Sequence, residues 1–84
     1  MNLDEIEFLR GLGARLRDRR AARGLTQAQL GEQCDLHRTF IGSVERGERN
    51  LSILNLRLVA RVLRVPLAEL FAAPQSDGPD WPSR

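Results

Sequence analysis

The sequence predicts a compact all-α domain of five helices, and three observations lead to this fold class. Apolar residues recur at intervals of three and four through most of the chain before Pro74. Residues that cap helix starts precede several of these segments, and glycines follow two of them. We expect one domain over residues 1–73 and a flexible tail over residues 74–84, where three prolines and a glycine leave too little apolar surface to fold.

The first helix is expected over Leu3–Arg23. Asn2 or Asp4 can cap its start, and the acidic residues of its first turns suit the positive end of the helix dipole. Gly11 and Gly13 each weaken the helix by up to about 1 kcal/mol relative to alanine. The apolar residues expected to face the core are Ile6, Leu9, Leu12 and Leu16.

The second helix should begin after Thr26 and run to about Cys34. The Thr26 side chain can accept from the free N–H groups of the first turn, while Gln29 reaches back to the Thr26 N–H and completes a capping box. Gly24, just before the cap, suits the left-handed end of the preceding helix. The apolar residues that flank the cap as a hydrophobic staple are Leu25 and Leu30.

The third helix, about residues 38–46, has a thin apolar seam and ends before Gly47, which suits a left-handed ending. The seam consists of Leu36, Ile41 and Val44. Five side chains that point away from this seam can donate hydrogen bonds, and they are His37, Arg38, Thr39, Ser43 and Arg46. A donor-rich face of this kind suits the DNA major groove, where arginine binds guanine O6 and N7 in a fork and threonine meets thymine or an acceptor.

Ser52 is expected to cap a fourth helix, with Leu51 and Leu56 as its staple, and Pro66 fits the first position of a fifth. The core face of the fourth helix should consist of Ile53, Leu56, Val59, Ala60 and Leu63. A second apolar row on the same helix consists of Leu54, Leu58 and Val62. The fifth helix completes the apolar set with Leu67, Leu70 and Phe71.

Charge is distributed unevenly along the chain, although the net charge is only +2. Residues 1–9 carry a net −3, residues 10–64 carry twelve arginines against five acidic residues, and residues 65–84 carry a net −2. All 13 basic residues are arginine. The positive charge on the folded middle favours a polyanionic partner, although a solvated face or genome base composition would also produce it.

Several classes of protein are not expected. Cys34 is the sole cysteine, so an internal disulfide or a thiolate metal cluster is excluded, and we interpret it as a small buried apolar residue. The chain has no apolar run long enough to span a membrane and no leader segment, which predicts a cytoplasmic, nucleoid-associated protein without a membrane partner. We find no paired carboxylates, nucleophile–histidine pair or phosphate-cradling glycine loop, so we expect no enzyme, cofactor or small-molecule ligand.

Residues 12–71 resemble the lambda-repressor-like (phage repressor and Cro, XRE-type) helix-turn-helix family of DNA-binding proteins. The matching segments are LGARLRDRR at 12–20, GLTQAQL at 24–30, LHRTFIGSVERGER at 36–49 and ILNLRLVARVLRVPLAELF at 53–71. Within that family, HRTFIGSVERGERNLS at 37–52 is most similar to the controller proteins of bacterial restriction–modification systems. The resemblance implies a recognition helix at residues 38–46, which binds the DNA major groove.

The resemblance also implies roles for individual residues. The expected base contacts are Arg38 and Thr39, with His37 and Ser43 as helpers, although His37 can instead cap the helix. The expected phosphate contacts are Gln27, Arg46, Arg49, Asn50 and, more weakly, Arg17. Arg20 is expected to pair with Glu45 in a partly buried salt bridge. Phe40 stands where similar proteins often carry tyrosine, so it either makes an apolar DNA contact or packs inside the protein.

A dimer is expected because one recognition helix contacts too few base pairs for useful specificity. Two helices about 34 Å apart would contact a palindromic operator. The expected dimer surface consists of Leu51, Leu54, Leu58, Val62 and Leu67, and the alternative is that this row is ordinary core. The function expected from the resemblance is therefore a dimeric transcriptional regulator that controls its own gene. The alternative is an antitoxin or adaptor that uses Leu54, Leu58 and the tail to hold another protein.

Overall fold

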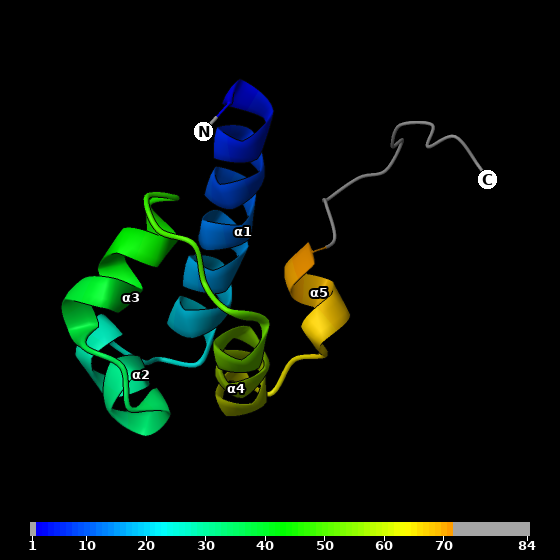
Figure 1. Ribbon diagram of the computed structural model, residues 1–84. Helices are drawn as coiled ribbons and strands as arrows, with labels where there is room; N and C mark the ends of the chain where they lie inside the picture. The colour runs from blue at the N-terminus through cyan, green and yellow to red at the C-terminus, as the bar shows by residue number, and fades with distance from the viewer. Residues whose placement is uncertain (1, 72–84) are drawn as a thin grey trace.

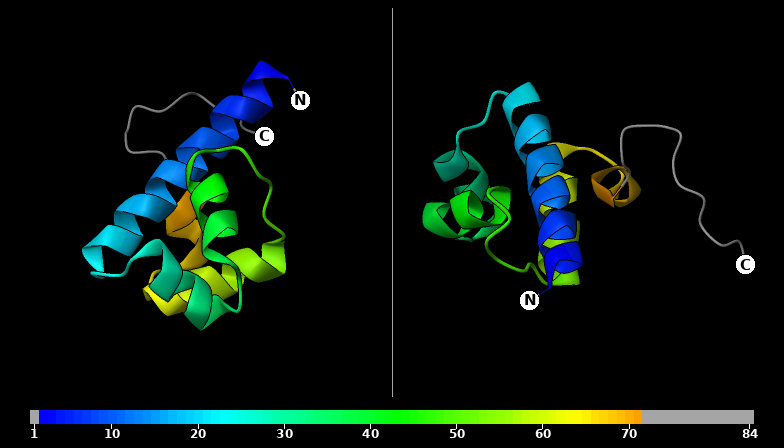
Figure 2. Two further views of the ribbon diagram at one scale, coloured as in Figure 1. Left: turned by 90° about the vertical axis from the view of Figure 1, so that its left-hand side faces the viewer. Right: turned by 90° about the horizontal axis from the view of Figure 1, so that it is seen from above.

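The computed structural model describes residues 2–71, and the predicted tail with Trp81 lies outside these residues. Five helices occur in order: α1 (Leu3–Ala22), α2 (Gln27–Cys34), α3 (Arg38–Glu45), α4 (Ile53–Leu63) and α5 (Leu67–Phe71). The long helix α1 lies between the α2–α3 pair on one side and α5 on the other, and α4 crosses near the C-terminal half of α1 (Figures 1 and 2). The predicted all-α, five-helix fold is confirmed.

The local signals in the sequence place the starts of the helices. Asn2 caps α1 and forms a capping box with Glu5. Thr26 and Gln29 form the predicted capping box at the start of α2, and Ser52 caps α4 by accepting from the Asn55 N–H. Each side chain satisfies backbone groups that the first turn of a helix leaves without an intrahelical partner. The predicted starts of α1, α2, α3 and α4 therefore agree with the structure.

The ends of α1 and α3 use the two predicted glycines. Gly24 and Gly47 have φ angles of 72° and 77°, and the backbone around each returns hydrogen bonds to the last turn of its helix. Both helices end one residue earlier than predicted, because Arg23 and Arg46 are the C-caps. Gly47 also lies against α1, since a Cβ atom on it would stand 2.8 Å from the Arg10 Cα.

The hydrophobic core lies where α1, α2, α3 and α4 meet, and α5 closes it. The side chains with the least exposure are Leu16, Leu30, Ile41, Val59, Leu63 and Leu70. Cys34 is buried among the same group, which agrees with its interpretation as a small apolar residue, and burial raises the pKa of its thiol. The predicted core faces of α1 and α4 are largely confirmed, although Ile6 is only half-buried.

Two residues predicted to face the core do not. Ile53 is 58% exposed, because it is the first residue of α4 and the core contacts of that helix begin with Leu56. Phe71 is 41% exposed, and its ring stacks on that of Phe8 with 6.4 Å between the centroids. Pro66 was predicted to be the first residue of α5, but the helix begins one residue later, at Leu67.

Candidate nucleic-acid interface

The start of α3 is held by a histidine cap. Nδ1 of His37 accepts a hydrogen bond from the Thr39 N–H at 3.1 Å and lies 2.8 Å from the Thr39 hydroxyl oxygen. Because Nδ1 accepts from the backbone, the proton of the neutral ring must be on the other nitrogen, Nε2. His37 therefore fixes the first turn of α3, and the remaining N–H of its ring is available to a partner.

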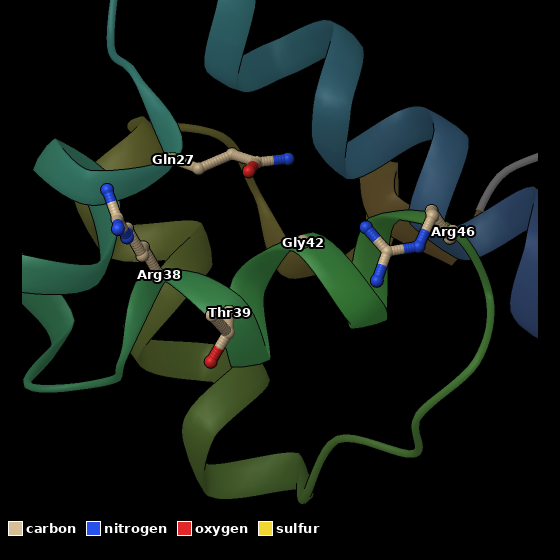
Figure 3. A pocket seen from close by; sticks show the side chains of 5 residues that line it. All are labelled: Gln27, Arg38, Thr39, Gly42 and Arg46. Atoms are coloured by element: carbon tan, nitrogen blue, oxygen red, sulfur yellow. The ribbon is translucent and has the colours of Figure 1, made fainter.

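A shallow hollow of about 300 Å³ runs along the exposed side of α3. Arg38 and Thr39 lie at one end of the helix and Arg46 at the other, while the Gln27 side chain extends from α2 over Gly42 (Figure 3). A Cβ atom on Gly42 would lie 3.2 Å from the Gln27 amide oxygen, so the glycine keeps the floor of the hollow open. Gly42 was not among the predicted site residues, although it is the one residue without a side chain within this helix.

Two guanidinium groups line this hollow, and both belong to exposed side chains. Ser43, another predicted base contact, is half-buried, and its hydroxyl donates to the Phe40 carbonyl oxygen at 2.8 Å. Its proton is thus used within the helix, which leaves Ser43 able to accept but not to donate without rearrangement. Arg38 and Thr39 are the predicted base-contact residues that the structure brings together in the hollow.

A buried carboxylate connects α3 to both α1 and α2. The Glu45 side chain is 2% exposed and that of its partner Arg20 is 14% exposed. Arg20 donates to both oxygens of Glu45, from Nε at 2.6 Å and from Nη2 at 3.0 Å, and its Nη1 donates to the Leu25 carbonyl. The hydrogen bonds that Arg20 donates to Glu45 raise the pKa of Arg20, and this effect outweighs the lowering by burial. The structure therefore contains the ion pair that the family resemblance implies.

Gln27 completes this network, because its amide nitrogen donates to Oε1 of Glu45 at 3.0 Å. A carboxylate only accepts, so the amide must present its nitrogen to Glu45. The three side chains come from three different helices, α1, α2 and α3. They fix the angle at which α3 presents its outer face, which is the geometric requirement for inserting a helix into a groove.

The other predicted phosphate contacts differ in what they do in the structure. Arg46 pairs with Glu48 at 3.1 Å, and the Arg49 guanidinium carbon lies 5.6 Å from the centroid of the Phe40 ring. The Asn50 side chain accepts from the Leu51 N–H. Arg17 is exposed on α1 and is not among the residues that line the hollow.

Close backbone approaches at two glycines let α3 and the turn before it pack against α1 and α2, and they were not predicted from the sequence. A Cβ atom on Gly13 would lie 2.6 Å from the Glu45 carbonyl oxygen and still closer to that of Val44. A Cβ atom on Gly31 would overlap the Leu36 carbonyl oxygen in the turn before α3. Glycine within a helix was interpreted only as a loss of helix propensity, whereas here it permits two backbones to touch. The signal available in the sequence was the presence of glycine at core-facing positions.

The predicted dimer surface lies on and around α4. Leu54 is 68% exposed, whereas the other four residues of this surface are half-buried and pack against the core. A second shallow hollow, of about 220 Å³, is lined by Leu54, Arg57, Leu58 and Arg61. The structure therefore leaves both interpretations of this row open. The residues contribute to the core, and they still present apolar surface that a second copy could cover.

Residues 2–71 contain neither a cluster of metal-ligating side chains nor a helix that could span a membrane. Within this part of the chain, histidine, cysteine, aspartate and glutamate do not gather into a group of three or more that could hold a metal ion. None of the described helices is both long enough and apolar enough to cross a membrane.

Comparison with known proteins gives one family and several relatives. A helix-turn-helix family model matches residues 16–70. The control protein C.SmaI of Serratia marcescens is 42% identical over 70 residues, which cover 83% of this chain and 77% of that protein. The control protein C.BamHI of Bacillus amyloliquefaciens is 41% identical over 46 residues, or 55% of this chain and 57% of that protein.

Solved structures agree with these sequence matches. The restriction-modification controller protein C.AhdI from Aeromonas hydrophila is 41% identical and superposes with a TM-score of 0.77, covering 81% of this chain and 99% of that chain. The hypothetical transcription factor NHTF from Neisseria is 32% identical, also with a TM-score of 0.77, covering 84% of this chain and 80% of that chain. The similarity thus extends over most of the described helices.

Proposed function

The chain belongs to the helix-turn-helix family, and from this premise we propose that it is a sequence-specific, dimeric DNA-binding transcriptional regulator. The observation that carries the proposal is the division of α3 into two faces. Ile41 and Val44 are buried, while Arg38 and Thr39 are exposed beside an open hollow. A short helix that buries one face and offers cationic and hydroxyl donors on the other is suited to contact base edges in the major groove.

Within this function, Arg38 is the principal base contact. Its guanidinium can donate to guanine O6 and N7 together, and such a bidentate contact contributes about 1–3 kcal/mol of discrimination against a wrong base. Thr39 would contact a neighbouring base through its methyl group, because its hydroxyl lies against the His37 ring. His37 and Ser43 act as helpers, His37 through Nε2–H and Ser43 as an acceptor.

Phosphate contacts would position α3 without specifying sequence. Gln27, at the start of α2, adjoins free backbone N–H groups that favour an anion, and Arg46, Arg49 and Asn50 would contact the backbone from the other end of α3. Arg17 would add to the general positive field. Each neutralised phosphate contributes about 0.9 to the slope of log K against log salt, which makes these contacts separable from base contacts by experiment.

The dimer would form through α4, using Leu54 with Leu51, Leu58, Val62 and Leu67. The exposed side chain of Leu54 and the half-buried apolar side chains around it support the proposal, since a two-fold interface would remove their remaining apolar surface from water. Two recognition helices would then contact a palindromic operator at half-sites about 34 Å apart.

Similarity to C.SmaI and to the restriction-modification controller protein C.AhdI supports a narrower proposal. The protein would regulate its own gene together with a restriction endonuclease gene. A duplex from the region upstream of its own gene should then bind more tightly than a duplex of the same composition in shuffled order. Equal affinity for the two duplexes would contradict autoregulation while leaving general DNA binding intact.

The decisive experiment is to select bound DNA from a random pool with the wild-type protein, Arg38→Ala and Arg38→Lys in parallel. We expect the wild type to enrich guanine at two symmetry-related positions. Arg38→Ala should lose that preference, and Arg38→Lys should weaken it, because lysine keeps the charge but lacks the planar fork of arginine. The lysine variant should retain more of the overall affinity. A wild-type protein that enriches no sequence at modest ionic strength would overturn the proposed function.

A further inference from the structure

Arg49 and Phe40 form a contact that the proposed phosphate role of Arg49 does not require. Arg49 is exposed in the segment after α3, and its guanidinium carbon stands 5.6 Å from the centroid of the Phe40 ring. Phe40 lies in the first turn of α3, half-buried, and packs against the hydrophobic core. The ring is thus anchored by the core, and a cation stands over it.

A guanidinium in this arrangement can bind two partners at once. Attraction to an aromatic ring acts between the ring face and the positive charge, whereas hydrogen bonds leave through the five N–H groups at the edge of the planar group. Within residues 2–71 no carboxylate pairs with Arg49, because the ion pairs are Arg19–Glu69, Arg20–Glu45 and Arg46–Glu48. Its N–H groups are therefore available to a phosphate while the cation remains over the ring.

Arg46 gives the contrast. It is similarly exposed and close in sequence, but it pairs with Glu48 at 3.1 Å and has no aromatic partner among the described residues. To contact a phosphate, Arg46 must give up a carboxylate, whereas Arg49 keeps its contact with Phe40. A long, flexible side chain that is already held near its bound position loses less rotamer freedom on binding.

We propose that Phe40 is a positioning residue for Arg49, holding the guanidinium beside the recognition helix so that it can bind a backbone phosphate at the edge of the operator. Phe40 would act through Arg49 and not by its own contact with DNA. This inference rests on the proposed DNA-binding function. It also explains why the ring suffices without the tyrosine hydroxyl, since the hydroxyl is not needed for attraction between a cation and the ring face.

A double-mutant cycle tests the proposal with Phe40→Leu, Arg49→Ala and the double variant. Affinity would be measured by fluorescence anisotropy on the duplex that the wild type selects. An exposed contact between a cation and a ring contributes enough for Phe40→Leu to weaken binding about two- to fivefold. In the Arg49→Ala background the same change should have no further effect. The salt slope should fall by about 0.9 in Arg49→Ala and should not change when Phe40→Leu is added to it.

The matched control is the cycle of Phe40→Leu with Arg46→Ala, which should be additive because Arg46 does not stand over the ring. Phe40→Tyr should retain more affinity than Phe40→Leu, since it keeps the aromatic face. If leucine disturbs folding, Phe40→Met gives a second apolar replacement with a flexible side chain. Thermal unfolding would show whether each variant is folded. Equal loss on Phe40→Leu with or without Arg49 would overturn the inference alone. A wild-type protein that binds no duplex would overturn the proposed function itself.

Discussion

The junction between α1 and α3 differs from the outer face of α4 in whether its side chains find partners within the same chain. At the junction the groups find partners within the chain: backbones touch at Gly13, and both oxygens of the Glu45 carboxylate accept hydrogen bonds from groups of the same chain. On α4, Ile53 and Leu54 remain in contact with water although both are large and apolar. The orientation of α3 is thus fixed by contacts within the monomer, while the α4 face keeps apolar side chains in water, where the proposed dimer would bury them.

The largest effect is expected from Arg20→Ala at the junction. This change leaves the Glu45 carboxylate buried without its cation, and breaking a buried pair in this way costs about 3–5 kcal/mol of unfolding free energy. Urea unfolding would measure the loss. DNA affinity should also fall, because Glu45 then holds only Gln27 among its former partners.

Arg19→Ala is the matched control on the neighbouring residue of the same helix. It breaks the Arg19–Glu69 pair, whose side chains are 46% and 43% exposed. Solvent screens that pair, so the expected loss is about 0.2–1 kcal/mol. Similar losses in the two variants would mean that the junction is no more dependent on its ion pair than the surface is.

Gly13→Ala should have the next largest effect. The added methyl group would overlap the carbonyl oxygens of Val44 and Glu45, so α1 and α3 must separate, at a cost of about 1–3 kcal/mol. Gly11→Ala is the control within the same helix, since its methyl group would meet only the end of the Arg15 side chain. That variant should change stability by less than about 1 kcal/mol in either direction. Equal destabilisation of the two variants would show that helix propensity, and not backbone contact, governs both positions.

The same contrast separates what the sequence predicts from what it does not. Thr26 and Gln29 act within one helical turn, so their spacing alone is enough to predict the start of α2. The pairing of Arg20 with Glu45 spans 25 positions and came from family resemblance, because spacing carries no such information. Local signals thus predict where the helices begin, whereas the contact that orients α3 was predicted only from family resemblance.

Features that depend on how helices meet were missed for the same reason. Periodicity assigned Ile53 to the core face of α4, but Ile53 is exposed and the buried residues of that helix begin with Leu56. Gly13 was interpreted only as a loss of helix propensity. The carbonyl groups that pack against it belong to α3, which is distant in the sequence. The donors on α3 were found from the pattern, whereas the engagement of Ser43 and of the Gln27 amide nitrogen required three-dimensional contacts.

The smallest effect on the fold is expected from Leu54→Asp on the α4 face. Leu54 lies largely in water, so the unfolding free energy of the monomer should change by less than about 0.5 kcal/mol. The dimer should nevertheless be lost, because a charge would be buried against its own copy across a two-fold axis. The unfolding midpoint of a dimer rises with protein concentration by mass action. We therefore expect that rise in the wild type and not in Leu54→Asp, measured over about a hundredfold range of concentration. A wild-type midpoint that does not move, together with a monomeric mass in sedimentation equilibrium, would mean that α4 is not the face through which two copies bind DNA.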